Sequence, residues 1–177
     1  SSVIAMNGPS RQGALILAQY LRSSPPWPRT HTYARDFLLA AQIIEQQAIN
    51  GKTDLFSVAA MNAGLASEQY LKSFLVEQDP VSQSFLKLIA GLPKNKHDLF
   101  GLYQKISPDL RNQLHDVSEQ LSPGFPLVER IKQCSQLFTH TRYGYEAGSL
   151  TVLRSEVFEL APHLDKVLTE MTKTVAA

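Results

Sequence analysis

The five histidines of the chain are its natural candidates for moving protons or binding a metal ion, and they are scattered along the sequence. They are His31, His97, His115, His140 and His163. No two of them stand three or four residues apart, the spacing that places two metal ligands on one helix face. We therefore expect no metal site and no cofactor. The sequence also lacks a phosphate-binding glycine loop and a glycine-flanked serine nucleophile, so it shows no machinery for nucleotide hydrolysis or serine-dependent hydrolysis.

Two charged residues occupy helix positions where the spacing calls for apolar side chains. Glu68 stands in the series Met61, Leu65, Glu68, Lys72 and Leu75, and Arg142 interrupts the seam Ile131, Cys134, Phe138 and Tyr145. Burying either charge alone would cost several kcal/mol, whereas a hydrogen-bonded pair persists in an interior. The spacing therefore predicts a buried ion pair between Glu68 and Arg142. Lys72, Tyr143 or Glu146 would complete this polar network.

Two other interpretations of these charges stay open on the sequence alone. Glu68 with Lys72, and Arg142 with Glu146, would also fit surface pairs one turn apart, each contributing about 0.3–0.5 kcal/mol. Alternatively, Arg142 faces a dimer cleft and binds phosphate. A buried pair has a distinct signature, because Glu68→Ala would cost about 3–5 kcal/mol and Arg142→Met would recover part of that loss.

The helices that position these residues follow from apolar periodicity, which predicts an all-α fold with no β-strand. The expected helices are a first from about Thr30 to Asn50-Gly51, a second from Thr53 or Asp54 towards Gln78, a short amphipathic piece over 81–92, one carrying Leu99 to Ile106, one opening at Ser107-Pro108, one from Leu127 to about Tyr145, and a last one after Gly148 that is kinked or restarted at Pro162. The second helix is apolar on almost every side, which predicts that it is central.

Composition places the chain among ordinary globular proteins. Its 177 residues are 44% hydrophobic and 19% charged with a net charge of +1, so we expect one core and no strong field for nucleic acid or membrane. The single cysteine, Cys134, fits a small buried residue. The sequence has no apolar run long enough to cross a bilayer and no signal-peptide pattern, which favours a cytoplasmic protein without membrane contact.

The first 29 residues differ from the rest and are expected to form an arm, with the main domain over 30–177. The arm combines a short helix over Gly13–Arg22 with a proline-rich linker, where three prolines in four positions oppose helix formation. Ala14 to Tyr20 and Trp27 present more apolar surface than a free tail should. We expect this arm to pack across a second copy in a homodimer; folding back onto its own domain is the alternative.

Three segments together resemble HEPN proteins, a family of helical domains. They are the small-residue run from Ala63 that leads to Glu68 and Lys72, the segment Lys96 to Tyr103, and Phe138 with Arg142 to Glu146. The resemblance covers about Thr30 to Lys173. It implies an up-and-down helical bundle, frequent dimerisation, and RNA cleavage in toxin and antiviral systems by some members, beside others without known catalysis.

The chain departs from the ribonucleases of that family at their catalytic motif, an arginine followed after four to six residues by a histidine on a late helix. There the histidine moves a proton and the arginine stabilises phosphate charge. Arg111 and His115 are too close and too early in the chain, and His140 precedes Arg142. We therefore expect a non-catalytic or degenerate dimeric binding module, whose partners would be RNA, a nucleotide or another protein. The alternative is a metal-independent ribonuclease that uses His140 and Arg142, or Arg111 and His115.

Overall fold

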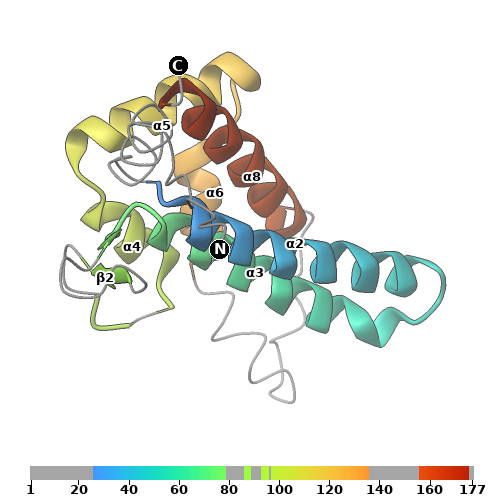
Figure 1. Ribbon diagram of the computed structural model, residues 1–177. Coiled ribbons are helices and arrows are strands. Elements are labelled where there is room, and N and C mark those ends of the chain that lie inside the picture. Colours follow the sequence, from blue (N-terminus) through green and yellow to red (C-terminus); the bar gives the residue numbers. More distant parts are fainter. Residues whose placement is uncertain (1–25, 79–85, 89–92, 96, 136–155, 176–177) are drawn as a thin grey trace, which may run out of the picture.

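The structure, a computed structural model, is a bundle of α-helices with one small pair of strands (Figure 1). It describes residues 26–78, 86–88, 93–95, 97–135 and 156–175. In chain order the elements are α2 (Pro28–Ile49), the 3-10 helix η1 (Thr53–Leu55), α3 (Phe56–Lys72), β1 (Val76–Gln78), β2 (Leu86–Leu88), α4 (Leu99–Lys105), α5 (Pro108–Leu121), α6 (Leu127–Cys134) and α8 (Glu156–Val175). The predicted all-α class is confirmed, and none of the described helices is long and apolar enough to cross a membrane.

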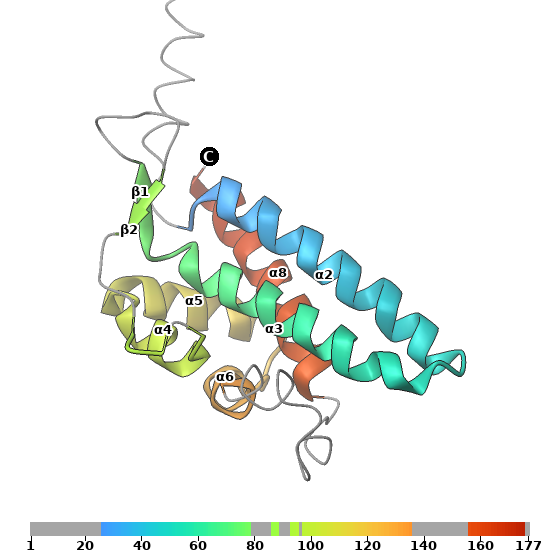
Figure 2. The same cartoon turned by 90° about the horizontal axis from the view of Figure 1, so that it is seen from below.

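Helices α2 and α3 form a long antiparallel hairpin. The chain reverses at Asn50 and Gly51, and Gly51 has a φ of +116°, a conformation that glycine adopts without a steric cost. Ala34, Leu38 and Ala41 are buried on the inner face of α2, and α3 carries the small buried residues Ala59, Ala60, Ala63, Gly64 and Ala66. Small residues let the two backbones approach closely. The ends of both helices near the turn project beyond the other described helices (Figures 1 and 2).

The core lies where α8 crosses the hairpin and meets α5 and α6 (Figure 2). Its fully buried large side chains include Tyr70 and Leu71 of α3, Leu102 of α4, Leu114 of α5, Ile131 of α6, and Leu160, Leu164 and Leu168 of α8. Helix α3 therefore has the central place that its sequence predicts. Cys134 is buried as expected, and burial raises the pKa of its thiol to about 12, which keeps the thiol protonated and inert.

Two predictions between residues 72 and 92 are wrong: the second helix does not continue towards Gln78, and residues 86–88 of the helical piece expected over 81–92 form a strand. The other residues of that piece lie outside the described part of the chain. Helix α3 ends at Lys72, and β1 pairs antiparallel with β2, with Val76 opposite Leu88 and Gln78 opposite Leu86. The short apolar run after Lys72 looked helical because its residues continue the apolar spacing of α3. Periodicity cannot separate a strand from a helix over so few residues, and the pairing partners lie eight to twelve residues further along the chain.

The helix starts are mostly as expected, with one correction at Pro28. We expected all three prolines of the linker to oppose helix, but Pro28 is the first residue of α2, where the missing N–H is not needed. Ser107 caps α5, because its hydroxyl accepts a hydrogen bond from the Leu110 N–H at 3.5 Å. Helix α8 runs unbroken through Pro162, so it does not restart there.

Part of the predicted late helix and most of the arm lie outside the described residues. Helix α6 is described to Cys134, so Phe138, Arg142 and Tyr145 fall beyond it. Of the arm, the structure describes only the end: the Trp27 N–H donates to the Ser73 carbonyl at 3.0 Å, and the indole Nε1 is buried. Trp27 therefore packs on the body of its own chain.

Candidate functional site

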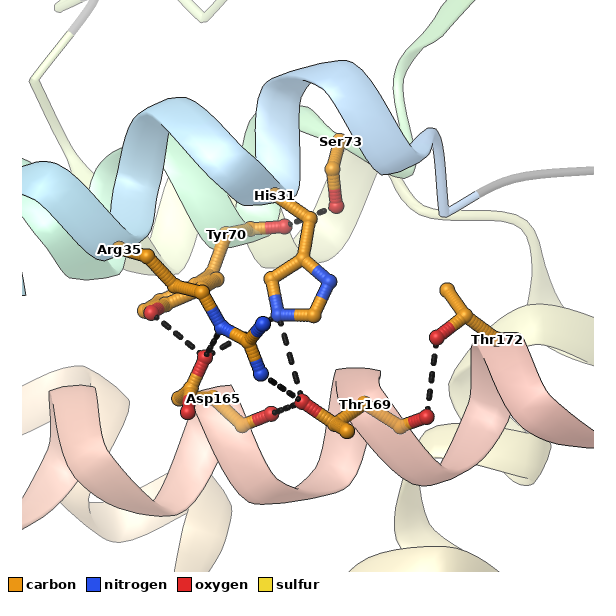
Figure 3. A network of polar contacts seen from close by, with 7 residues as sticks. All are labelled: His31, Arg35, Tyr70, Ser73, Asp165, Thr169 and Thr172. Carbon is orange, nitrogen blue, oxygen red and sulfur yellow. Dashed lines mark hydrogen bonds and ion pairs between the residues drawn. The ribbon is translucent and has the colours of Figure 1, made fainter.

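The densest group of polar contacts converges on one oxygen atom of Asp165 (Figure 3). Asp165 Oδ1 accepts hydrogen bonds from Arg35 Nε at 2.8 Å and from the Tyr70 hydroxyl at 2.9 Å, and it lies 3.1 Å from His31 Nε2. These side chains come from α2, α3 and α8. A single carboxylate thus connects the three longest of the described helices, and we call this set, with Thr169, the Asp165 cluster.

Thr169, one turn after Asp165 on α8, extends the cluster. Its hydroxyl donates to the Asp165 backbone carbonyl at 2.6 Å and accepts from an Arg35 guanidinium nitrogen at 2.8 Å. Arg35 therefore bridges two successive turns of α8. The helical spacing explains the arrangement, because His31 and Arg35 are four residues apart on α2, and Asp165 and Thr169 are four apart on α8.

Burial and hydrogen bonding set the charges of the cluster. Burial alone would raise the pKa of Asp165, but hydrogen bonds from Arg35, His31 and Tyr70 outweigh it and hold that pKa below its ordinary value. Burial lowers the pKa of His31 and raises that of Tyr70. Near neutral pH, an ionised carboxylate therefore faces a charged arginine, a neutral histidine and a neutral tyrosine. In this state the His31 Nε2–H group donates a hydrogen bond to Asp165 Oδ1.

An aspartate, a histidine and an arginine side by side are residue types that can transfer protons and bind phosphate. In this cluster, however, His31 Nε2 and two of the guanidinium nitrogens of Arg35 are directed at Asp165 and Thr169. The His31 side chain is only 8% exposed, and that of Arg35 is 50% exposed. The arrangement therefore acts as a cross-link between helices, with one face of Arg35 open to solvent.

A second polar group surrounds Glu68 on α3. The side chain of Glu68 is only 3% exposed and forms an ion pair with Lys72, one turn later, and its Oε2 lies 3.0 Å from His97 Nδ1. The burial that the apolar spacing predicts for Glu68 is therefore present. Arg142 and Glu146 lie outside the described residues, so their part in the network stays a prediction.

The structure brings together Arg111 and His115, two of the candidates for an atypical nuclease site. They lie on α5 beside Tyr103 of α4: the Tyr103 hydroxyl is 2.6 Å from His115 Nε2, and the Arg111 guanidinium lies 5.7 Å from the centre of the tyrosine ring. Phe100 stacks against Tyr103, and the Lys132 ammonium lies 5.1 Å from the centre of the Phe100 ring. The other candidates, His140 and Arg142, fall outside the described part of the chain.

The remaining buried histidine, His163 of α8, has a wholly internal setting. Its ring stacks on Phe125 with centroids 3.7 Å apart, and Nε2 lies 2.7 Å from the Ser118 hydroxyl. Burial lowers the pKa of His163 to about 4, so the imidazole is neutral at physiological pH. Within the described residues, no group of three or more histidine, cysteine or acidic side chains is arranged to hold a metal ion.

Sequence reasoning missed the Asp165 cluster. The four-residue spacings of His31 with Arg35 and of Asp165 with Thr169 were visible in the sequence and place each pair on one helix face. Nothing local indicates that two helix faces 130 or more residues apart in the sequence come into contact. Tyr70 was visible only as part of an apolar helix, where an aromatic residue is first interpreted as core.

Comparison of the chain with models of known protein families, with curated proteins and with solved structures gives no significant match in any of the three.

Proposed function

We propose that the chain is a non-catalytic helical binding or accessory module of the HEPN-like type, and that it works as a homodimer. One observation carries the proposal: Asp165 Oδ1 takes up donors from Arg35, Tyr70 and His31 together. The described cluster that most resembles a proton-transfer site is thereby committed to joining α2, α3 and α8. The His31 side chain is only 8% exposed, so its other ring nitrogen, Nδ1, has little access to a substrate, whereas a histidine that transfers protons in catalysis must reach one.

The resemblance to HEPN proteins supplies the proposed setting, a toxin or antiviral system with RNA, a nucleotide or another protein as the partner. With a net charge of +1, the protein has no strong overall electrostatic attraction for an anionic partner, so we expect such a partner to bind through a local contact. Arg35 is a cation that such a contact would use, since half of its side chain is exposed although two of its nitrogens are bound to α8.

A second function, metal-independent RNA cleavage, is favoured by the meeting of Arg111 and His115 around Tyr103. In this arrangement His115 is the proton carrier and Arg111 the phosphate ligand, and Tyr103 holds both in place. The contact of His115 Nε2 with the tyrosine hydroxyl would have to open for the histidine to reach a substrate. This requirement ranks cleavage below binding.

Incubation of the purified protein with mixed RNA, in the presence of a chelator, separates the two functions. The binding proposal expects no cleavage by the wild type and the same background from Arg111→Ala and His115→Ala. Gln113→Ala, an exposed change on the same helix, is the matched control. Cleavage by the wild type that disappears with His115→Ala or His140→Ala, but survives Gln113→Ala, would establish the nuclease and overturn the proposal. A monomer by light scattering at tens of micromolar would remove the homodimer from it.

A further inference from the structure

Large apolar side chains that are exposed gather on the α2–α3 hairpin. In the described part of the chain they are Tyr33, Leu39, Ile43, Ile49, Val58 and Leu121, and all except Leu121 belong to α2 or α3. Single exposed apolar residues are ordinary. Here, however, the segment 37–67 contains only three charged residues, Glu45, Lys52 and Asp54, although the hairpin projects from the bundle (Figure 1). Depletion of charge beside exposed apolar residues is typical of an interaction surface.

The outer face of α2 carries a regular row, Asp36, Leu39, Ile43 and Gln46, which we call the α2 stripe. Its steps are three, four and three residues, the spacing of a seam between two packed helices, and all four residues are exposed. Leu39 and Ile43, in the middle of the stripe, are 57% and 56% exposed. The opposite face of α2, with Ala34, Leu38 and Ala41, packs inward. Helix α2 therefore has two seams, and the structure shows a partner for only one of them within the described residues.

We infer that a second copy of the chain packs its own α2 antiparallel against this stripe, about a two-fold axis midway between Leu39 and Ile43. The inference rests on the proposed homodimer and names its interface. The spacing of the stripe residues is the same in both directions from that midpoint, with an apolar pair in the middle and a polar residue at each end. Leu39 consequently packs on the partner's Ile43, and Asp36 lies opposite the partner's Gln46. An interface of this kind, where one patch meets itself, is the usual form in two-fold dimers.

The symmetric spacing of the stripe favours a copy of the same chain as the occupant, and charge favours the antiparallel arrangement of the two copies. Asp36 is the charged residue of the stripe, and a parallel pairing would place it against the partner's Asp36. Antiparallel pairing separates the two carboxylates by ten residues of helical rise, about 15 Å, which exceeds the screening length of about 8 Å at physiological salt. The apolar pair then lies at the centre and polar residues lie at the rim, as interface anatomy requires.

Charge changes at Gln46 test the orientation. If Gln46 lies opposite the partner's Asp36, Gln46→Lys adds two attractive pairs per dimer and lowers the dimer dissociation constant about two- to tenfold, whereas Gln46→Glu raises it by a similar factor. High salt should weaken both effects. In a parallel dimer Gln46 would face itself, and both substitutions would weaken association. Sedimentation equilibrium measures the constants, with Gln113→Lys on α5 as the control.

A charge in the centre of the stripe tests the surface itself. Leu39→Lys should raise the dimer dissociation constant at least about tenfold, because it removes the apolar contact and places a cation on the seam. Leu121→Lys changes an exposed leucine of α5 and should leave the constant unaltered. Circular dichroism melting of each variant, diluted until it is monomeric, verifies that the helices remain folded.

Cross-linking provides an independent measurement. The double variant Asp36→Cys with Gln46→Cys should form disulfide-linked dimers on mild oxidation, while Asp36→Cys alone should not, since a disulfide requires Cα atoms within about 7 Å. The native Cys134 is buried and should not compete. Cross-linking of Asp36→Cys alone would overturn the antiparallel arrangement.

A dimer that survives Leu39→Lys would overturn the inference, but the proposed dimeric module could still form through another surface. A monomeric wild type would overturn the inference and the homodimer together, with the RNA assay still deciding catalysis.

Discussion

The fold places two acidic side chains, Glu68 and Asp165, against basic partners from other parts of the chain. Glu68 interrupts an apolar helix row, and the structure confirms the burial that this position predicts. Its described partners are Lys72, one turn away, and His97, which is brought near by the fold. The same reasoning could not find the Asp165 cluster, because none of its residues departs from the pattern of its own helix. A mismatch with the local pattern is visible in a sequence, whereas a match between distant faces is not.

His163 gives a pH prediction at this scale. Its pKa in the folded chain is about 4, below the ordinary value of 6.5, so the neutral form is favoured by folding. Neutral His163 makes its full contribution to the unfolding free energy above about pH 6.5, and this contribution is lost as the pH falls towards 4. The difference between these two pKa values corresponds to about 3 kcal/mol of unfolding free energy. We expect urea unfolding to show a steeper loss of stability over this range for the wild type than for His163→Gln.

The comparison between the two proteins isolates His163 from its neighbours. The pKa of His31 is also lowered, so His31 adds to the acid sensitivity of both proteins equally. The pKa of Asp165 lies below 3.8, and its contribution is lost only at still lower pH. The positive charge of Lys166 also opposes protonation of His163 and so lowers the pKa of this histidine in addition to burial. Parallel stability curves for the wild type and His163→Gln between pH 4 and 6.5 would contradict the assignment.

At the scale of elements, the sequence predicts helices where one stretch supplies its own signals. Ser107 and Pro108 start α5 as expected, and the small residues of α3 fit closely under α2. The prediction fails between Val76 and Leu88, where two strands of three residues pair with each other. The pairing is decided by contacts outside each strand, so a window of neighbouring residues carries no record of it.

Gly101 of α4 is an element-scale case in which a helix needs a glycine for space. A Cβ at this position would lie 2.8 Å from Asp98 Oδ2 and 3.0 Å from Pro93 Cβ. Asp98 cannot easily give way, since its carboxylate accepts a hydrogen bond from Ser135, whose hydroxyl in turn accepts from the Phe100 N–H at 2.9 Å. Gly101→Ala should therefore destabilise the protein by about 1–3 kcal/mol.

The sign of this effect is informative, because alanine normally stabilises a helix interior by about 0.5–1 kcal/mol relative to glycine. Chemical denaturation of Gly101→Ala measures the change. Gln104→Ala, on the exposed side of the same helix, is the control and should stay within about 0.5 kcal/mol of the wild type. A gain in stability on Gly101→Ala would show that α4 shifts away from Pro93 and Asp98 without cost.

For the whole molecule, the sequence predicts the class of fold and the central place of α3, because both depend on which helix faces are apolar. The crossing of α8 over the hairpin, which creates the Asp165 cluster, depends on how those faces are paired. Apolar packing is not directional, whereas polar contacts such as those of Arg35 with Asp165 and Thr169 form only in the observed pairing of α2 with α8. In the described part of the chain, this pairing leaves Leu39 and Ile43 exposed on the outer face of α2, which belongs to the projecting hairpin.

If that face joins two copies, the stability of the whole protein must depend on its concentration. Unfolding a dimer yields two chains, so a tenfold increase in concentration above the dissociation constant adds about 1.4 kcal/mol per dimer, or half that per chain. An unfolding entropy of about 2.1 cal/mol/K per residue converts this to a rise of about 2 °C in Tm for a chain of 177 residues. Between 1 and 100 µM we therefore expect the wild-type Tm to rise by about 4 °C in differential scanning calorimetry or circular dichroism. Leu39→Lys should show a smaller rise over that range because its dimer is weaker, and Leu121→Lys should follow the wild type. A wild-type Tm that stays constant would mean that association does not stabilise the folded chain, which would contradict a dimer formed through the α2 stripe.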